Sequence, residues 1–277
     1  MKPERELKIE QRIDADTKHE LHTHDLLEIN VLLEGYARFK QADHDYSGRP
    51  GDVFFFRPGE PHYNLAEDRD TPITWIMVLF SPSIVRMIPG GQRLLYPFYT
   101  EAATPLLSRN SPYARSIQTA ARGAYEEQQH KLPGWEAKQF MYFIDILSNI
   151  YRHTLAESAG PGNSSGAEVD SSVQLAVEYI LQHIAEDIDM ETIAELSGRG
   201  RTQLYTRFKR AVGVTPNQYI NRLRMQMATD LLKTTDKSVT EIAFECGYNS
   251  LQYFNKHFKQ YREMSPREFR NRSRQAI

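Results

Sequence analysis

The chain has 277 residues, of which 25% are charged and 40% hydrophobic, a composition typical of globular proteins and a length that suits two domains. It contains no apolar run of about 18 residues, which excludes a membrane-spanning helix, and its first residues lack an apolar secretion signal. The single cysteine, Cys246, excludes an intramolecular disulfide and favours a reducing cytoplasmic location.

The formal net charge of −2 is unevenly distributed. Residues 171–277 hold 16 Lys and Arg against 12 Asp and Glu, whereas residues 1–170 hold 18 against 24. Between Leu196 and Thr229 there are seven basic residues and no acidic one. On charge alone, a solvated helical face explains this concentration better than a surface that contacts phosphates.

Short apolar segments separated by turns fill residues 1 to about 82. The segments LEINVLLEG, ARFKQ, GDVFFFRPG and PITWIMVLF are rich in β-branched and aromatic residues, so they predict strands. On a strand, His22 and His24 face the same side, and Glu28 and His62 could converge with them. Three imidazoles and a carboxylate suit Zn, Fe, Mn or Ni, so these four residues are candidate ligands of a divalent metal.

The same four residues could instead line a pocket for a small-molecule effector without binding a metal. Other residues of this region are weaker candidates for the same pocket: Arg38, Tyr46, Asn64 and Trp75. Trp75 lies on the apolar segment ITWIMVLF, where a place in the core is the more frequent role.

Residues from about 83 to 156 predict helices. One helix is expected over roughly Tyr113–His130, and Pro133-Gly134 separates it from a second long helix. Helical spacing relates six apolar residues of the second helix: Phe140, Phe143, Ile144, Leu147, Ile150 and Tyr151. This stripe predicts core packing or a homodimer interface within residues 111–156. His130 and His153 are expected at the surface.

The segment ESAGPGNSSGAEVDSS, residues 157–172, is rich in Gly, Ser and Ala and predicts a flexible linker. After it, sequence features recur with a period of about 50 residues. Ile193-Ala194 matches Ile242-Ala243, and Thr215-Pro216 matches Ser265-Pro266. Two copies of one supersecondary unit explain this recurrence.

The second copy predicts a helix-turn-helix unit. Val239–Cys246 forms a short helix, and Gly247 permits the left-handed backbone that ends it. Asn249 is expected to cap a second helix, Ser250–Lys259, whose inner face is anchored by Tyr253 or Phe254 together with Phe258. Its candidates for DNA contact are Leu251, Gln252, Asn255, Lys256 and Lys259.

The first copy repeats this plan. Thr192–Ser197 is the expected supporting helix and Arg201–Arg210 the recognition helix, with Leu204 and Phe208 facing inward. The helix Pro216–Leu232 joins the two units. The outward candidates for base contact are Arg201, Thr202, Tyr205 and Thr206, and those for phosphate contact are Arg207, Lys209 and Arg210.

On these residues the chain resembles the AraC/XylS family of bacterial regulators over roughly Val173–Arg272, most closely in Ser238–Arg270. The resemblance implies double-stranded DNA as a partner, with two recognition helices in major-groove segments about 34 Å apart. The first copy departs from the family pattern, since Gly200 replaces a capping Ser and Thr206 replaces Arg.

A second resemblance covers residues 20–80. His22-x-His24-x3-Glu28-x6-Gly35 is similar to the first cupin motif, and Gly51–Asn64 is similar to the second, although Pro58 is displaced by one position. The resemblance implies a small double-sheet β-barrel.

The predicted fold class is therefore a two-domain protein: an N-terminal all-β cupin-like barrel followed by helices, and a C-terminal all-α domain with two helix-turn-helix motifs joined by a long helix. The expected boundaries are 1–156 for the sensing and dimerisation domain (barrel about 1–82, helices about 83–156), 157–172 for the linker and 173–277 for the DNA-binding domain.

These features predict a sequence-specific DNA-binding transcription regulator controlled by an effector. The AraC/XylS resemblance implies a sugar or oligosaccharide as effector, with RNA polymerase as a partner if the protein is an activator. No cofactor is required, and no nucleophile or phosphate-binding motif indicates an enzyme, because Cys246 is expected to be a buried structural thiol. The alternative is a metal-dependent cupin enzyme fused to a DNA-binding domain.

Overall fold

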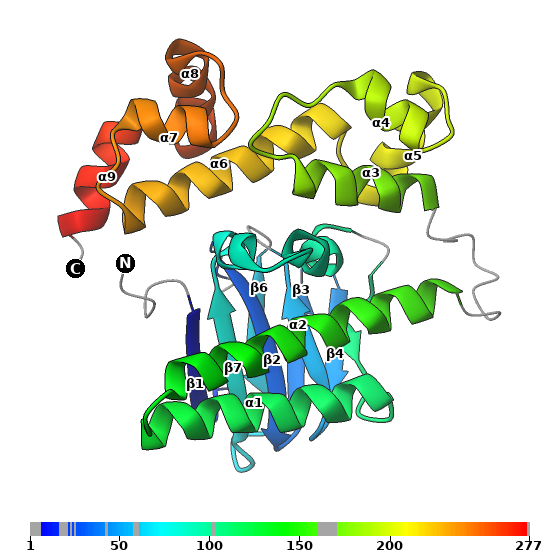
Figure 1. Cartoon of the computed structure of the whole chain (residues 1–277). Coiled ribbons are helices and arrows are strands. Elements are labelled where there is room, and N and C mark those ends of the chain that lie inside the picture. The colour runs from blue at the N-terminus through cyan, green and yellow to red at the C-terminus, as the bar shows by residue number, and fades with distance from the viewer. Residues whose placement is uncertain are drawn as a thin grey trace. The chain divides into compact units, whose positions relative to one another are not determined.

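The computed structural model describes residues 7–16, 22, 24, 26–41, 44–57, 61–100, 103–159 and 171–275. The chain divides into two compact units, one spanning Glu6–Met87 and Leu94–Glu168 and the other built mainly on Val169–Ile277 (Figure 1). The expected order of a strand-rich N-terminal unit and a helical C-terminal unit is confirmed. None of the helices in the described ranges is both long and apolar enough to cross a membrane.

Two antiparallel sheets form the body of the N-terminal unit. The larger has the strand order β1 (Leu7–Asp14), β7 (Ile73–Phe80), β2 (Leu27–Glu34), β5 (Val53–Phe56) and β8 (Leu106–Leu107). The smaller has the order β4 (His44–Gly48), β3 (Ala37–Gln41) and β6 (His62–Ala66). The first six residues of β2 are all buried, which fits its central place between β7 and β5.

The two faces of the larger sheet have different neighbours. Helices α1 (Pro112–His130) and α2 (Trp135–Ala159) cover one face, where the rings of Phe80 and Phe143 lie 4.9 Å apart (Figure 1). The other face packs on the smaller sheet, with the rings of Phe39 and Phe54 stacked at 3.5 Å. Glu28 pairs in register with Phe56, so this buried carboxylate faces the smaller sheet.

The region expected to be helical from about residue 83 is only partly so. Two 3-10 helices, η2 (Pro82–Met87) and η3 (Gly91–Tyr99), precede strand β8, which completes the sheet by pairing with β5. Helix α2 continues to Ala159, so the first three residues of the expected linker are helical. Residues 160–170 of that linker lie outside the described part of the chain, as does Pro58 of the cupin-like motif.

The surface position expected for His153 is wrong. Its exposed fraction is 8%, and its ring lies 5.9 Å from that of Tyr113 on α1. Its Nε2 lies 3.3 Å from Oε1 of Glu157. The packing of α1 against α2 buries this face of α2, a tertiary contact that periodicity within one helix does not reveal.

The C-terminal unit contains seven helices among its described residues: α3 (Ser171–Gln182), α4 (Met190–Leu196), α5 (Arg201–Val212), α6 (Pro216–Thr234), α7 (Val239–Glu245), α8 (Leu251–Arg262) and α9 (Pro266–Gln275). The first helix-turn-helix unit is formed by α4 and α5, and the second by α7 and α8. Helix α6 runs between them and contributes Leu231 and Leu232 to the core of the second unit (Figure 1).

Polar caps define where these helices begin. Thr215 with Gln218 and Ser238 with Glu241 form capping boxes at α6 and α7. Ser250, and not the expected Asn249, caps α8, because its hydroxyl accepts from the backbone N–H of Tyr253. Cys246 is fully buried in the second core, in agreement with a structural role.

Candidate ligand cavity and DNA-recognition helices

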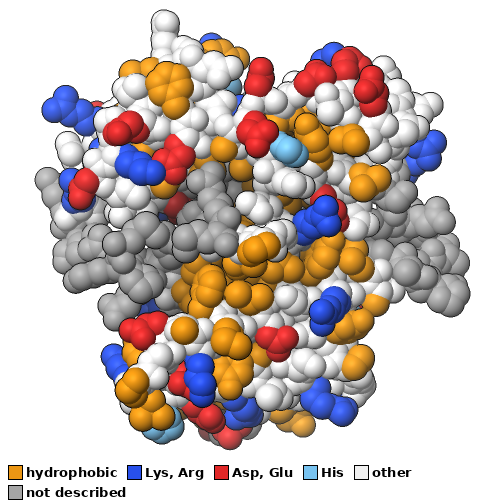
Figure 2. Space-filling view, viewed as in Figure 1, with side chains coloured by type: hydrophobic (Ala, Val, Ile, Leu, Met, Phe, Trp, Pro, Cys, Tyr) orange, Lys and Arg blue, Asp and Glu red, His pale blue; other side chains and the backbone are white. Residues whose placement is uncertain are grey.

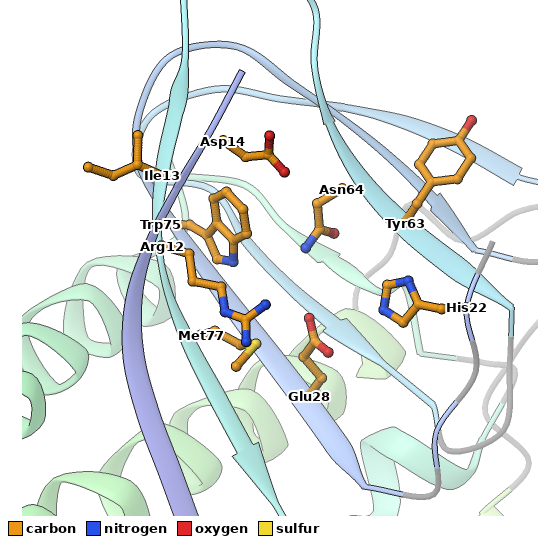
Figure 3. A pocket seen from close by; sticks show the side chains of 9 residues that line it. All are labelled: Arg12, Ile13, Asp14, His22, Glu28, Tyr63, Asn64, Trp75 and Met77. Atoms are coloured by element: carbon orange, nitrogen blue, oxygen red, sulfur yellow. The ribbon is translucent and has the colours of Figure 1, made fainter. Parts of the chain in front are cut away.

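A cavity of about 360 Å³ opens between the two sheets of the N-terminal unit (Figure 3). Its lining comes from strands β1, β2, β6 and β7 together with His22. Trp75 and Met77 supply apolar surface, and Glu28 and Asn64 supply polar groups. The cavity therefore combines one aromatic wall with several hydrogen-bonding side chains, as small-molecule sites commonly do.

Four side chains gather at one end of this cavity: His22, His24, Glu28 and His62. One ligand atom from each lies within 4.8 Å of the others. Backbone hydrogen bonds between His22 and His62, at 3.2 and 3.1 Å, hold their two segments together. The structure thus brings together the four residues whose convergence the strand geometry predicts.

Glu28 is the centre of this cluster. Its Oε2 lies 2.9 Å from Nε2 of His24 and 3.5 Å from Nε2 of His62, and its Oε1 accepts from Nδ2 of Asn30 at 2.8 Å. Burial raises the pKa of the Glu28 carboxyl, but the hydrogen bonds and positive charge of His24 and His62 outweigh it. The pKa of Glu28 is therefore held well below its ordinary value, and the side chain is a buried carboxylate at neutral pH.

Among the residues that the structure describes, two buried polar atoms of the cavity lining have no hydrogen-bond partner. They are Nε1 of Trp75, a residue only 5% exposed, and Oδ1 of Asn64. Trp75 also belongs to the hydrophobic core between the sheets, so its side chain both packs in the core and lines the cavity. An unpaired donor and an unpaired acceptor in one cavity match a ligand group that can both accept and donate.

Arg38 and Tyr46, two of the expected pocket residues, lie outside the lining of this cavity. Arg38 is exposed because alternation along β3 places it on the face opposite the buried Phe39. Tyr46 is the cross-strand partner of Phe39 and packs against the same core. The alternation of side chains along the segment ARFKQ could have excluded Arg38 from the pocket, because its neighbour Phe39 is the apolar residue that faces the core.

Strand β1 contributes lining residues that were not predicted from the sequence. Arg12 and Asp14 come from the segment LKIEQRID, in which Ile9 is the buried residue of the opposite face. Tyr63 of β6 was missed as well. The alternation of Ile9 with polar residues could have predicted that β1 is a strand. It could not have predicted that β1 borders the cavity, because its partner β7 lies more than 50 residues away in the chain.

In the second helix-turn-helix unit, α8 presents one apolar and one polar face. Phe254 and Phe258 are fully buried, which settles the choice between Tyr253 and Phe254 as the inner anchor. The expected contact residues with exposed side chains are Gln252, Asn255, Lys256 and Lys259. Leu251, expected to face outward, is instead half-buried against the core, because the first turn of α8 packs on that core.

In the first unit, α5 repeats this arrangement with Leu204 and Phe208 inside. Of the expected contact residues, the exposed ones are Arg201, Thr202, Thr206 and Lys209, and the half-buried ones are Tyr205 and Arg207. Arg210 is also exposed. The Arg201 guanidinium is 3.0 Å from the Glu191 carboxylate, so it is partly neutralised within the protein.

Two further exposed residues of these helices were missed. Gln203 and Tyr253 occupy the same position of the two copies, 50 residues apart, and Tyr253 is 56% exposed. Aligning the two copies on Phe208 and Phe258 would have found both, because that alignment fixes which positions of each helix face outward.

Two family models match this chain. One, described as an AraC-like ligand binding domain, matches residues 8–141, and the other, described as a helix-turn-helix domain, matches residues 193–272. The first match contains every strand except the first residue of β1, together with the whole cavity lining, and the second contains α5–α8 in full. The two matches therefore account for both units.

Among curated proteins, the HTH-type transcriptional activator RhaS of Enterobacter sp. (strain 638) is 28% identical over 262 residues, covering 90% of this chain and 86% of the relative. Among solved structures, the DNA-binding domain of AdpA in complex with a target DNA is 31% identical, covering 38% of this chain and 95% of that chain, with a TM-score of 0.37. An AraC-type transcriptional regulator from Chromobacterium violaceum is 30% identical, covering 39% of this chain and 96% of that chain, with a TM-score of 0.36.

Proposed function

Because this chain belongs to the AraC family of DNA-binding transcription regulators, we propose that a small molecule bound in its N-terminal cavity controls its action on DNA. The unpaired Trp75 Nε1 and Asn64 Oδ1 of the cavity lining carry this proposal. A buried polar atom without a partner costs about 1–3 kcal/mol. A ligand that completes both hydrogen bonds would recover that free energy.

A sugar or oligosaccharide is the effector class that this cavity favours. A hydroxyl group donates and accepts, so it can satisfy both the indole N–H and the amide oxygen. The Trp75 ring and Met77 offer apolar surface to the C–H face of a sugar ring, and Arg12 and Asp14 offer further polar groups. The cavity volume lies near the lower end of the range for small-molecule sites, about 300–1,000 Å³.

A thermal-shift screen of the full chain against sugars and other metabolites tests this effector class. We expect a neutral polyhydroxylated compound to raise the melting temperature of the N-terminal unit. Trp75→Phe keeps the ring but removes the N–H, so its shift at the same ligand concentration should be smaller. The proposed effector class would be contradicted if only anionic or aromatic metabolites bound, and if they bound equally well to the wild type and to Trp75→Phe.

A divalent metal at the His22, His24, Glu28 and His62 cluster is a second proposal, which concerns the same cavity. The donor set fits Zn²⁺, Fe²⁺, Mn²⁺ or Ni²⁺, since three imidazole nitrogens and one carboxylate already lie within 4.8 Å of one another. A bound metal would supply a Lewis acid for hydroxyl oxygens of the effector. Within the protein, Asn30 would orient the Glu28 carboxylate through its 2.8 Å hydrogen bond.

Calorimetric titration of metal-stripped protein with Zn²⁺ tests this metal site. His62→Ala should abolish the binding isotherm, whereas His44→Ala, an exposed histidine of the same unit, should leave it unchanged. Equal binding by both variants would assign the zinc to another site. Turnover assays on the loaded protein then separate a sensor from the alternative of a metal-dependent enzyme.

For the DNA-binding helices, we propose that Gln252 reads a base and that the half-buried Arg207 contacts phosphate, together with the exposed candidates of α5 and α8. Gln252→Ala should relax specificity at one or two adjacent base pairs, by about 1–3 kcal/mol for a lost bidentate contact. Arg207→Ala should weaken binding to all sequences and flatten its dependence on salt concentration. Binding profiles across variant sites and salt series check both, and a Gln252→Ala profile identical to the wild type at every base would contradict this assignment.

We further propose that residues 1–156 sense the effector and form a homodimer, that residues 173–277 bind DNA, and that residues 157–172 link them. Met141 of α2 and Leu132 before it are 68% and 64% exposed. Figure 2 shows hydrophobic side chains on the side of the N-terminal unit that α1 and α2 cover in Figure 1. Sedimentation of residues 1–170 that gave only monomer at tens of micromolar would contradict the dimer. Because the curated relatives are named as activators, we propose RNA polymerase as a further partner.

A further inference from the structure

Arg224 lies in the middle of α6, where the two helix-turn-helix units of the C-terminal unit meet. Its Nε donates to the backbone oxygen of Ile184 at 3.0 Å, and its Nη2 donates to that of Glu186 at 2.7 Å. Both oxygens belong to the loop between α3 and α4, on the side of the first helix-turn-helix unit. The same guanidinium lies 5.6 Å from the ring centre of Tyr248, in the turn of the second unit. One side chain therefore contacts both units.

Gly247 approaches the same contact from the second unit. A Cβ at this position would lie 2.8 Å from the backbone oxygen of Ile184 and 2.9 Å from the guanidinium carbon of Arg224. Gly198 is its counterpart in the first copy, and it also has a positive φ, +63° against +79°. A Cβ on Gly198 would meet nothing within 4 Å. Both turns require the left-handed backbone, but only the Gly247 turn also requires the absence of a side chain.

Tyr248 and Ile184 complete the contact with buried surface. Tyr248 is 4% exposed, and its hydroxyl lies 3.4 Å from Oδ1 of Asn221 on α6 and 3.4 Å from Nδ1 of His257 on α8. The Ile184 side chain packs against the core of the second unit. Burial lowers the pKa of the Arg224 guanidinium, so this cation has exchanged much of its water for the two carbonyls and the aromatic ring.

We infer that Arg224, Gly247 and Tyr248 form a junction that holds the two recognition helices at a fixed separation and thereby sets the spacing between the two DNA segments that the protein reads. In Figure 1, α6 spans the C-terminal unit, with α3–α5 at one end and α7–α9 at the other. Helix α6 alone would connect the ends but would still bend, whereas the junction ties the α3–α4 loop directly to the second turn. Arg224 is a positioning residue in this inference and contacts no base.

A fixed separation has a measurable consequence for DNA. One inserted base pair moves the second DNA segment by about 3.4 Å and rotates it by about 35° around the duplex, which a rigid protein cannot follow. The wild-type protein should therefore lose about ten-fold or more in affinity for each such insertion, comparable to a mismatched base pair. A protein with a broken junction should tolerate the insertion.

The first test selects DNA from a pool of randomised 40-base-pair duplexes with the full-length protein. The wild type should enrich two sequence elements at one spacing, and Arg224→Ala should enrich the same elements at several spacings. Arg224→Lys keeps the charge but cannot reach both carbonyls, so it should give an intermediate result. Gly247→Ala should resemble Arg224→Ala, and Gly198→Ala is the matched control, because it adds the same backbone strain without touching the junction.

The second test does not depend on DNA. Spin labels on Gln203 and Gln260, both exposed, report the distance between α5 and α8 in the full chain, with Cys246→Ser removing the native thiol. We expect one narrow distance distribution for the wild type and a broader one for Arg224→Ala. Tyr248→Phe, which removes only the hydroxyl, provides a milder variant should Arg224→Ala fail to fold.

Unchanged distance distributions in Arg224→Ala and Gly247→Ala would overturn the inference. It would also be overturned if Arg224→Ala weakened DNA binding by the same factor whatever the spacing between the two sequence elements. If the wild type enriched no DNA, the DNA-binding assignment would fail on its own, and the distance measurement would still decide whether the junction fixes the two helices.

Discussion

Phe254→Ala should destabilise the C-terminal unit by about 3–5 kcal/mol, the usual cost of truncating a buried phenylalanine. The Phe254 side chain is fully buried, and its ring lies 5.4 Å from that of Tyr248 and 5.8 Å from that of Phe258. The loss is a large part of the stability of an ordinary domain, about 5–15 kcal/mol. Sequence-specific DNA binding should fall with it, because α8 would no longer be held at a fixed orientation.

Hydrogen exchange measured peptide by peptide is the suitable assay, since the two units of the chain need not unfold together. Amides of α7 and α8 should lose protection in Phe254→Ala, and those of the N-terminal sheets should not. Tyr253→Ala is the matched control, because the neighbouring side chain is 56% exposed and its truncation should change stability by about 0.5 kcal/mol or less. Equal protection in the two variants would show that Phe254 does not anchor α8.

Glu28→Ala should destabilise the N-terminal unit by about 3–5 kcal/mol at pH 7. The measurement is made in the presence of a chelator, so that no metal binds to the cluster. The substitution removes the acceptor of His24 Nε2 and of Asn30 Nδ2, and it leaves the amide of Asn30 fully buried and the ring of His24 partly buried. Glu34→Ala is the matched control, since Glu34 is an exposed glutamate at the end of the same strand. Chemical unfolding followed in the N-terminal unit gives the difference between the two variants.

The pH dependence of this difference follows from the direction of the pKa shift. The carboxyl has a lower pKa in the folded protein than its ordinary value of 4.5, so the unfolded chain takes up its proton first as the pH falls. The contribution of Glu28 is therefore fully present above about pH 4.5 and is lost progressively as the pH falls below it. A stability gap between wild type and Glu28→Ala that stayed constant from pH 7 to pH 3 would show that Glu28 does not have a lowered pKa.

Local sequence patterns predicted most of the C-terminal unit. The spacing of Leu204 with Phe208 and of Phe254 with Phe258 identifies the inner face of each recognition helix, and the structure buries all four. The residue that caps α8 could not be predicted from the sequence pattern, because Asn249 and Ser250 are adjacent and both residue types cap helices. Only the backbone conformation at the start of α8 decides for Ser250.

The cavity was harder to predict because strands distant in the chain build it. The spacing of His22 and His24 indicated two members of the cluster, but Arg12 and Asp14 reach the cavity only because β1 pairs with β7. Arg38 shows the converse, since its polarity suggested a pocket residue and its register in β3 places it outside. A single sequence contains the alternation along each strand, and it does not contain the pairing between strands.

Helix α6 is shared by the two helix-turn-helix units, and this limits how regulators of this design can be recombined. Tyr219, near the start of α6, packs on Phe208 of the first unit, whereas Leu231 and Leu232, near its end, belong to the core of the second. In a chimera joined in the segment between α6 and α7, the transplanted second unit would pack its core against an α6 from the other parent. A crossover inside α6, between Tyr219 and Leu231, keeps each helix-turn-helix unit with the α6 residues that pack on it. Such hybrids would keep the parental spacing between the two DNA segments only if Arg224 and its two carbonyl partners remain matched.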